Sequence, residues 1–164
     1  MNSIFSRTSI RNYLPKAVED EKITQILKAA MAAPSAGNQQ PWEFYVVKNP
    51  QILKLLAACS PYSGCLAGAP VAIVPCYRTE CYFPENAEMD LSAATENMLL
   101  EINDLGLGAV WLGVAPLQDR MDAVRKVLDI PAGLVPFAMI PIGYPVRVQP
   151  QQDRYDSSRI HTVE

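Results

Sequence analysis

The chain has 164 residues, of which 49% are hydrophobic, and this is enough for one ordinary domain with a buried core. Its net charge of −3 and its isoelectric point near 5.2 argue against a general nucleic-acid binder, because the basic residues are scattered. The sequence has no apolar run of about 18 residues and no apolar signal core at its start, so we expect a cytoplasmic protein that does not cross a membrane.

Cysteine and histidine usage disfavours metal chemistry and histidine-based catalysis. The four cysteines, Cys59, Cys65, Cys76 and Cys81, form no C-x-x-C pair, and His161 is the only histidine. Zinc sites need more ligands or closer spacing, so we expect no metal site. Scattered thiols in a protein without a secretion signal are expected to stay reduced. A catalytic triad would depend on the one histidine near the C-terminus, which disfavours that mechanism.

The first half of the chain predicts a helix, a strand and a second helix. Apolar residues at helical spacing predict a helix over 19–35, with acidic residues in its first turn and Pro34 ending it. The segment 42–47 alternates and is rich in aromatic and β-branched residues, which is typical of a strand. A second helix is expected over 49–59, with Asn49 as its N-cap and a proline at its first helical position.

The second half predicts three further strands and two further helices. They are a central strand over 69–77, the longest helix over 89–108, a strand over 109–114, a helix over 117–131 and a strand over 137–145. The glycines Gly106 and Gly108 are expected to end the longest helix. Pro141 cannot donate a hydrogen bond to a neighbouring strand, so we expect it at a bulge or a strand end.

This alternation of helices and strands predicts one layered α+β or α/β domain that spans residues 1–164. The last stretch, 145–164, is long and polar, although it ends in "RIHTV", which is able to pair as a strand. Such a tail is either disordered or lies on another subunit, and we favour an arm that lies on the partner subunit.

The N-terminal stretch "SRTSIR" offers groups that suit a phosphate. Arg7 and Arg11 are four residues apart, so on a helical turn they would lie on one face, and Ser9 lies between them in sequence. Arginine binds phosphate through paired hydrogen bonds and keeps its charge, and a hydroxyl adds a further donor. The alternative is a solvated surface turn with spaced arginines.

The stretch "PSAGNQQPW" (34–42) carries more polar side chains than a turn requires. Ser35, Asn38, Gln39 and Gln40 offer donors and acceptors without charge, which suits a neutral heterocycle. The alternative is helix-stop chemistry, in which proline and glycine end the helix and the amides satisfy free backbone groups.

The glycines of "LGLGAVWLGV" and the lone Arg154 are each compatible with either a binding role or a structural role. The glycines of "LGLGAVWLGV" do not follow the G-x-G-x-x-G pattern after a strand, which disfavours a dinucleotide-binding motif. Gly113 within a strand pattern indicates a bulge or the close approach of something flat, with ordinary packing as the alternative. Arg154 stands in a polar tail, where its alternative role is that of a solvated charge.

Four stretches together resemble the nitroreductase family of flavin enzymes. They are "SRTSIRNY", "APSAGNQQPWEF", "DLSAATENMLLEINDLGLGAVWLG" and "PIGYP…DR…RIH", and their order and spacing match from about residue 4 to residue 161. The resemblance implies an α+β fold in which helices flank a central mixed or antiparallel sheet. It also implies an obligate homodimer with two FMN molecules in its interface and an exchanged C-terminal arm over 145–164.

The same resemblance implies which residues contact FMN. Its phosphate would be held by the segment Arg7, Thr8, Ser9 and Arg11 together with Arg154. Its isoalloxazine ring would meet Pro34, Ser35, Ala36 and Asn38 of the other subunit and the stretch Trp111, Leu112 and Gly113. A backbone N–H near flavin N5 would be a fixed dipole at the atom that accepts hydride. No catalytic side chain and no metal are implied, because the flavin carries the chemistry.

Three departures from the family pattern bear on function. Ala36 stands where a second serine is common, so one hydroxyl contact is missing. The stretch 61–68, "PYSGCLAG", has no basic residue where many members have one, although a positive group there would stabilise the anionic reduced flavin. The chain also lacks the extra helices that cover the substrate channel in larger members, so we expect an open flavin face.

The resemblance implies an FMN-dependent oxidoreductase that uses NAD(P)H to reduce nitroaromatic, quinone or flavin-type acceptors by ping-pong hydride transfer through flavin N5. Two alternatives stay open at this point, namely another FMN chemistry of the same fold and a flavin-binding or redox-sensing protein with little turnover. The sequence does not decide the acceptor, the choice between NADH and NADPH, or one- against two-electron reduction.

Overall fold

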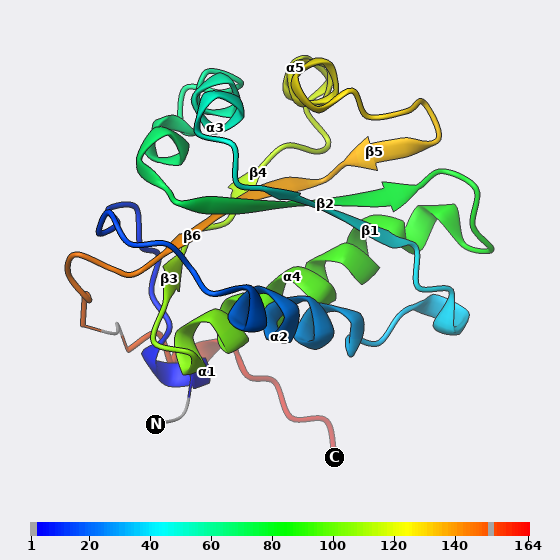
Figure 1. Cartoon of the computed structure of the whole chain (residues 1–164). Coiled ribbons are helices and arrows are strands. Elements are labelled where there is room, and N and C mark those ends of the chain that lie inside the picture. Colours follow the sequence, from blue (N-terminus) through cyan, green and yellow to red (C-terminus); the bar gives the residue numbers. More distant parts are fainter. Residues whose placement is uncertain (1–2, 151–152) are drawn as a thin grey trace.

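The computed structural model describes residues 3–150 and 153–164 of the chain (Figure 1). Its helices and strands follow in the order α1 (Ser3–Ser6), α2 (Asp20–Met31), β1 (Trp42–Val47), α3 (Pro50–Ala57), β2 (Val71–Arg78), α4 (Ala87–Asp104), β3 (Gly108–Ala109), β4 (Leu112–Gly113), α5 (Gln118–Leu128), β5 (Leu134–Pro136) and β6 (Ala138–Gly143). Short 3-10 turns are η1 (Ala36–Asn38), η2 (Gly64–Gly68), η3 (Pro84–Asn86) and η4 (Ser157–Arg159). Across the described ranges, no helix has the length and apolar character needed to span a membrane.

A central sheet separates two layers of helices. Figure 1 shows α2 and α4 on one face of the sheet and α3 and α5 on the other. The continuous apolar run of β2 serves both faces, because successive side chains of a strand point in opposite directions. Val71 and Ile73 join the core under α2 and α4, whereas Ala72 and Val74 join the core under α3 and α5.

The sheet has six strands in the order β1-β2-β6-β3, with β5 also paired to β2 and β4 also paired to β6. Every pair between these named strands is antiparallel. The prediction of an α+β fold around a central sheet, flanked by helices, is therefore confirmed.

Local sequence signals explain where several elements begin and end. α3 begins as predicted, because Asn49 Oδ1 accepts hydrogen bonds from the backbone N–H groups of Gln51 (2.8 Å) and Ile52 (3.4 Å). α2 ends at Met31, three residues before the proline that was expected to stop it. β1 has the bounds that its alternating pattern predicted.

The strand predicted over 109–114 is present in two pieces, β3 and β4. Both pieces pair with β6 in one continuous register, and its continuation places Val110 opposite Pro141. Because Pro141 has no N–H to donate, the hydrogen-bond ladder between the strands is interrupted there. The carbonyl of Pro141 accepts a hydrogen bond from the Tyr13 hydroxyl at 3.2 Å. The expectation that Pro141 lies at a bulge or strand end is wrong, since it lies inside β6 and pairs with Ala72.

The described part of the C-terminal tail makes no strand. Residues 153–164 contain only the turn η4, and every one of them is exposed. The pairing of "RIHTV" as a strand is therefore not seen within this chain. Tyr155, Ile160 and Val163 are 77%, 58% and 95% exposed, so the tail buries little apolar surface against its own subunit.

Candidate functional site

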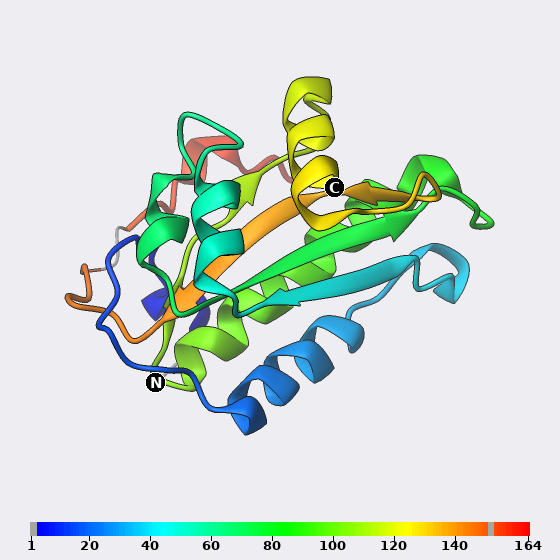
Figure 2. The same ribbon diagram turned by 45° about the horizontal axis from the view of Figure 1, so that its top comes forward.

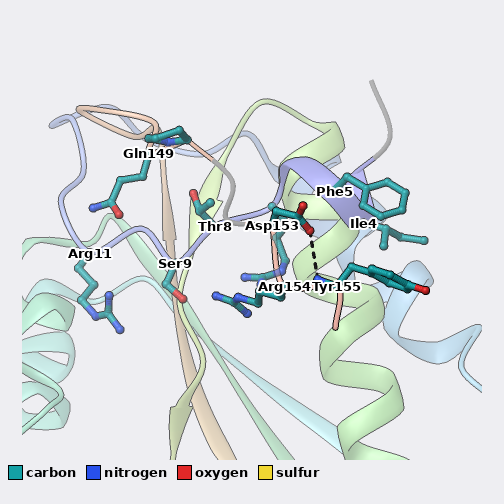
Figure 3. Close-up of a pocket in the computed structure, with 11 residues that line it drawn as sticks. Ile4, Phe5, Thr8, Ser9, Arg11, Gln149, Asp153, Arg154 and Tyr155 are labelled. Atoms are coloured by element: carbon teal, nitrogen blue, oxygen red, sulfur yellow. Dashed lines mark hydrogen bonds between the residues drawn. The ribbon is translucent and has the colours of Figure 1, made fainter. Parts of the chain in front are cut away.

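A cavity of about 740 Å³ lies between the two ends of the chain (Figure 3). Its lining comes from the segment 4–11 on one side and from residues 149–150 and 153–155 on the other. Four side chains were expected to bind phosphate, namely Arg7, Ser9, Arg11 and Arg154. All four line this one cavity, and so does Thr8. The fold thus brings together predicted residues from opposite ends of the sequence.

The segment 7–11 is extended, which corrects the expectation of a helical turn. α1 ends at Ser6, and Ser9 forms a parallel bridge with Ala109 of β3. The next residue, Ile10, donates its N–H to the carbonyl of Ala109 at 2.8 Å and is buried over Gly108, where a Cβ would lie 2.7 Å from it. Alternate residues of an extended chain share one side, so the arginines and the serine still face one way.

The cavity lining is positively charged. It contains three arginines against one carboxylate, that of Asp153, which accepts a hydrogen bond from the N–H of Tyr155 at 3.1 Å. Arg7 lies 3.6 Å from a carboxylate oxygen of Glu96 on α4. In the described chain, Arg11 and Arg154 form neither an ion pair nor a side-chain hydrogen bond. Free guanidinium groups beside a hydroxyl are the donor set that an anionic phosphate requires.

Arg11 lies on the side of Ser9 away from Arg154 (Figure 3). Its charge acts on Cys65 in η2: burial raises the pKa of this thiol, and the nearby guanidinium partly opposes that shift. The charge of a basic residue therefore acts on the 61–68 stretch, although the stretch itself contains no basic residue. Sequence inspection of that stretch alone could not detect it, because the group comes from the N-terminal segment.

The strand line continues from β3, which Ser9 bridges at Ala109, to β4. Trp111 is half-buried, with its ring 5.5 Å from that of Phe137 in an edge-to-face arrangement, and Leu112 is buried. Gly113 is exposed, and a Cβ built on it would meet nothing within 4 Å. Its carbonyl accepts a hydrogen bond from Arg120 at 3.1 Å. The backbone at Gly113 is thus exposed, and its contact with a flat group stays a prediction.

The 34–40 loop is attached to α4 by a buried carboxylate. The two oxygens of Asp90 accept hydrogen bonds from the N–H of Ala36 (2.9 Å) and from the side-chain amide of Gln39 (2.7 Å). The Ser35 hydroxyl accepts from the N–H of Gln40 at 3.0 Å, and the Gln40 amide donates to Asn38 at 2.9 Å. Part of the loop's polarity therefore serves its own backbone, which is the structural alternative left open by the sequence.

The phosphate-type cavity and the 34–40 loop lie at opposite ends of the molecule. Figures 1 and 2 show the N-terminal segment at one end of α4 and the loop beyond the other end. A single chain therefore does not bring the two predicted halves of the site together. Pro34 and Asn38 of the loop are exposed, while Ser35 and Ala36 are half-buried.

The sequence did not single out two carboxylates that contact the predicted site residues. Asp90 and Glu96 both lie on α4, within a helix whose apolar spacing was its main signal. The sequence marks Asp90 only as an acidic residue in the first turn of a helix. Its hydrogen-bond partners are more than 50 residues away in the chain, so the sequence does not indicate them. Of the residues that the structure describes, no three or more His, Cys, Asp or Glu side chains gather as metal ligands.

Comparison with known proteins decides the family. A profile described as "Nitroreductase family" matches residues 4–61 and 57–144. The chain belongs to the nitroreductase family. It is 41% identical, over 98% of its length and 85% of the relative's, to a Methanothermobacter thermautotrophicus protein named "Putative NADH dehydrogenase/NAD(P)H nitroreductase". The family resemblance drawn from the sequence motifs is thereby confirmed.

Solved structures agree with this nitroreductase assignment. The crystal structure of a Clostridium acetobutylicum protein named "Putative NADH Oxidase" superposes with a TM-score of 0.96 at 44% identity, covering 99% of each chain. An FMN-dependent nitroreductase from Clostridium difficile R20291 gives a TM-score of 0.93 at 30% identity, covering 99% of this chain and 98% of that chain. Coverage this complete extends the likeness to both terminal segments.

Proposed function

We propose that this nitroreductase-family protein is an FMN-dependent oxidoreductase that uses NAD(P)H to reduce nitroaromatic, quinone or flavin-type acceptors. The observation that carries the proposal is the cavity of about 740 Å³ that gathers three arginines and a serine beside β3. Two of those guanidinium groups lack an ion-pair partner among the described residues, so the donor set fits a phosphate ester. The family relatives named for NAD(P)H and for FMN support the same conclusion.

The residues divide into a phosphate group and a ring group. Arg7, Ser9 and Arg154 would hold the phosphate, with Thr8 in the same segment. The exposed backbone at Gly113 lies four residues along the strand line from Ala109, about 13 Å at the usual rise of a strand. This spacing leaves room for a ribityl chain between the phosphate and a ring that covers Trp111, Leu112 and Gly113.

Arg11 is assigned to the space between these groups. Its charge acts on Cys65, so it supplies positive potential beside the 61–68 stretch as well as near the phosphate. A positive group at that point favours a negatively charged reduced ring. In this proposal, Arg11 takes the role of the basic residue that the 61–68 stretch lacks.

We further propose that the ring is enclosed by a second copy of the chain. The 34–40 loop lies too far along α4 to serve the cavity of its own subunit, which supports a homodimer in which Pro34, Ser35, Ala36 and Asn38 reach the flavin of the partner. The exposed apolar side chains of the tail support an arm over 145–164 that packs on that partner. A cytoplasmic location stays a prediction.

FMN, when bound, supplies hydride acceptance from a nicotinamide and hydride donation to an acceptor. The chain's own residues then bind and orient: guanidinium groups neutralise the phosphate, and the open backbone at Gly113 admits a flat ring. No side chain in this assignment acts as nucleophile or general acid.

Expression of the full chain tests the proposal. The purified protein should be yellow, release FMN on denaturation, and oxidise NADH or NADPH when a nitroaromatic or a quinone is added. A screen of acceptors with each nicotinamide would identify the preferred pair. A colourless protein that neither binds added FMN nor oxidises NAD(P)H would refute the proposed function.

A further inference from the structure

The start of the cavity segment is anchored to α4. Asn103 Nδ2 donates hydrogen bonds to the hydroxyls of Ser3 (2.9 Å) and Ser6 (2.8 Å), both in α1, which directly precedes Arg7. Figure 1 shows α1 beside the end of α4. Glu96 lies about two helical turns before Asn103 on the same helix, so the two side chains leave α4 on one side. This side of α4 therefore faces the segment that carries the arginines.

Glu96 pairs with Arg7 through one atom of the guanidinium. Glu96 Oε1 lies 3.6 Å from Arg7 Nε, and among the described residues the two terminal nitrogens of Arg7 have no hydrogen-bond partner. Arginine binds a phosphate through a pair of N–H groups, and the two terminal nitrogens supply such a pair. Because Arg7 lines the cavity, the ion pair leaves its phosphate-binding end available there.

This ion pair contributes orientation rather than stability. The side chains of Arg7 and Glu96 are 23% and 50% exposed, and water screens pairs at partly exposed positions. A free arginine side chain, by contrast, loses its rotamer freedom at the moment it binds a ligand. Glu96 lowers this cost because it restricts Arg7 beforehand. The carboxylate also repels a phosphate, but it does so across the length of the guanidinium, where solvent and the positive charge weaken the repulsion.

We infer that Glu96 is a positioning residue that acts through Arg7 and strengthens the preference of the cavity for a flavin phosphate over a flavin without a phosphate. The inference rests on the proposed function, because that function makes the phosphate of FMN the ligand of the cavity arginines. In this arrangement Arg7 contacts the phosphate, and Glu96 fixes the orientation in which Arg7 does so without contacting the flavin itself.

Titration of the flavin-free full chain with FMN and with riboflavin tests the inference. Riboflavin is FMN without its phosphate, and quenching of flavin fluorescence measures the binding of both. Glu96→Ala should raise the Kd of FMN about three- to tenfold, because part of the ordering cost of one side chain returns to the binding step. The Kd of riboflavin should stay unchanged. Glu96→Gln keeps an acceptor oxygen for the Nε–H of Arg7, so it should lose less FMN affinity than Glu96→Ala.

The same substitution in an Arg7→Ala background separates positioning from structural support. Without Arg7, Glu96 has no guanidinium to orient and only repels the phosphate, so Glu96→Ala should leave the Kd of FMN unchanged or lower it. A purely structural role would instead raise the Kd in both backgrounds and for both flavins. As a matched control, Glu101→Ala removes another carboxylate from α4, one that forms no ion pair in the described chain, and it should change neither Kd.

The outcomes distinguish the inference from the proposed function. An unchanged Kd of FMN in Glu96→Ala would overturn the inference while the proposed function stands. An equal rise of that Kd with and without Arg7 would do the same. A wild-type protein that binds no FMN would overturn the proposed function, and the inference with it.

Discussion

At the scale of single residues, Arg11 gives the simplest test of the FMN assignment. Arg11→Ala removes a guanidinium that has no ion-pair partner among the described residues, so FMN binding should weaken by about 1.5–3 kcal/mol. Titration of the flavin-free protein with FMN, followed by quenching of flavin fluorescence, measures this change. Arg11→Lys keeps the charge and should lose less, and Lys126→Ala on α5 should bind as wild type does. Unchanged affinity in Arg11→Ala would make Arg11 an ordinary surface residue.

Asp90 is predicted to matter for stability rather than for chemistry. Asp90→Ala leaves the N–H of Ala36 and the amide of Gln39 without their acceptor, and it should lower the free energy of unfolding by about 2–3 kcal/mol. Urea denaturation measures the loss. Asp122→Ala, which removes an exposed carboxylate from α5, should change stability by no more than about 0.5 kcal/mol. Equal stability of the two variants would show that the loop does not depend on Asp90.

Cys76 predicts a loss of stability in alkali. Burial raises the pKa of this thiol from 9.0 to about 12, so above about pH 9 the unfolded chain loses a proton that the folded chain keeps. The free energy of unfolding should then fall by about 1.4 kcal/mol per pH unit from this group, and its contribution is constant below that pH. Tyr77, whose pKa burial raises from 10.0 to about 12, adds to the fall above about pH 10.

Urea denaturation at about pH 8 and about pH 10.5 measures that slope. Cys76→Ala should be less stable overall, because it leaves a cavity, yet it should show a shallower decline with pH. Cys81→Ala leaves the buried thiol in place and should keep the wild-type slope. An equally steep decline in Cys76→Ala would exclude the thiol as its cause.

The identities of the cavity residues were predictable, while their conformation was not. Arg7, Ser9 and Arg11 face one side in an extended chain as they would on a helical turn, so the pattern itself does not distinguish the two. Gln39 was expected to line a pocket, yet its amide is committed to Phe83 and Asp90. These partners lie more than 40 residues away, and a local pattern carries no information about them.

At the scale of elements, strong periodicity was sufficient to predict a helix or a strand from the sequence, and short elements were missed. β1 and α3 were predictable because alternation and an Asn-Pro cap are complete within a few residues. α1 and β5 have four and three residues, which is too short for a periodic signal. The predicted strand 109–114 is divided in two because Pro141 has no N–H. Only the pairing in the folded sheet brings Pro141 opposite Val110.

The C-terminal arm provides a prediction at this scale. Truncation before Asp153 removes Arg154 from the cavity and the exposed apolar side chains of the tail, so FMN retention and dimer stability should both fall. Analytical ultracentrifugation and the ratio of flavin to protein absorbance measure the two effects. Arg154→Ala in the full chain should lower FMN retention alone. A truncated protein that remains a fully flavinated dimer would contradict arm exchange.

At the scale of the whole molecule, the central claim is that each FMN site is shared between two subunits. The cavity arginines and the 34–40 loop lie at opposite ends of one chain, so the claim requires that each chain supplies only half of a site. Arg7→Ala combined with Arg11→Ala should empty the phosphate half. Pro34→Trp, at an exposed loop position, should block the ring half. Each variant alone should therefore form a flavin-poor homodimer.

Co-expression of these two variants with different affinity tags tests the claim most directly. A purified heterodimer contains one site with both defects and one site with wild-type residues throughout. The shared-site arrangement predicts one bound FMN per heterodimer, measured by flavin release, against almost none in either homodimer. A heterodimer that is as flavin-poor as both parents would contradict it.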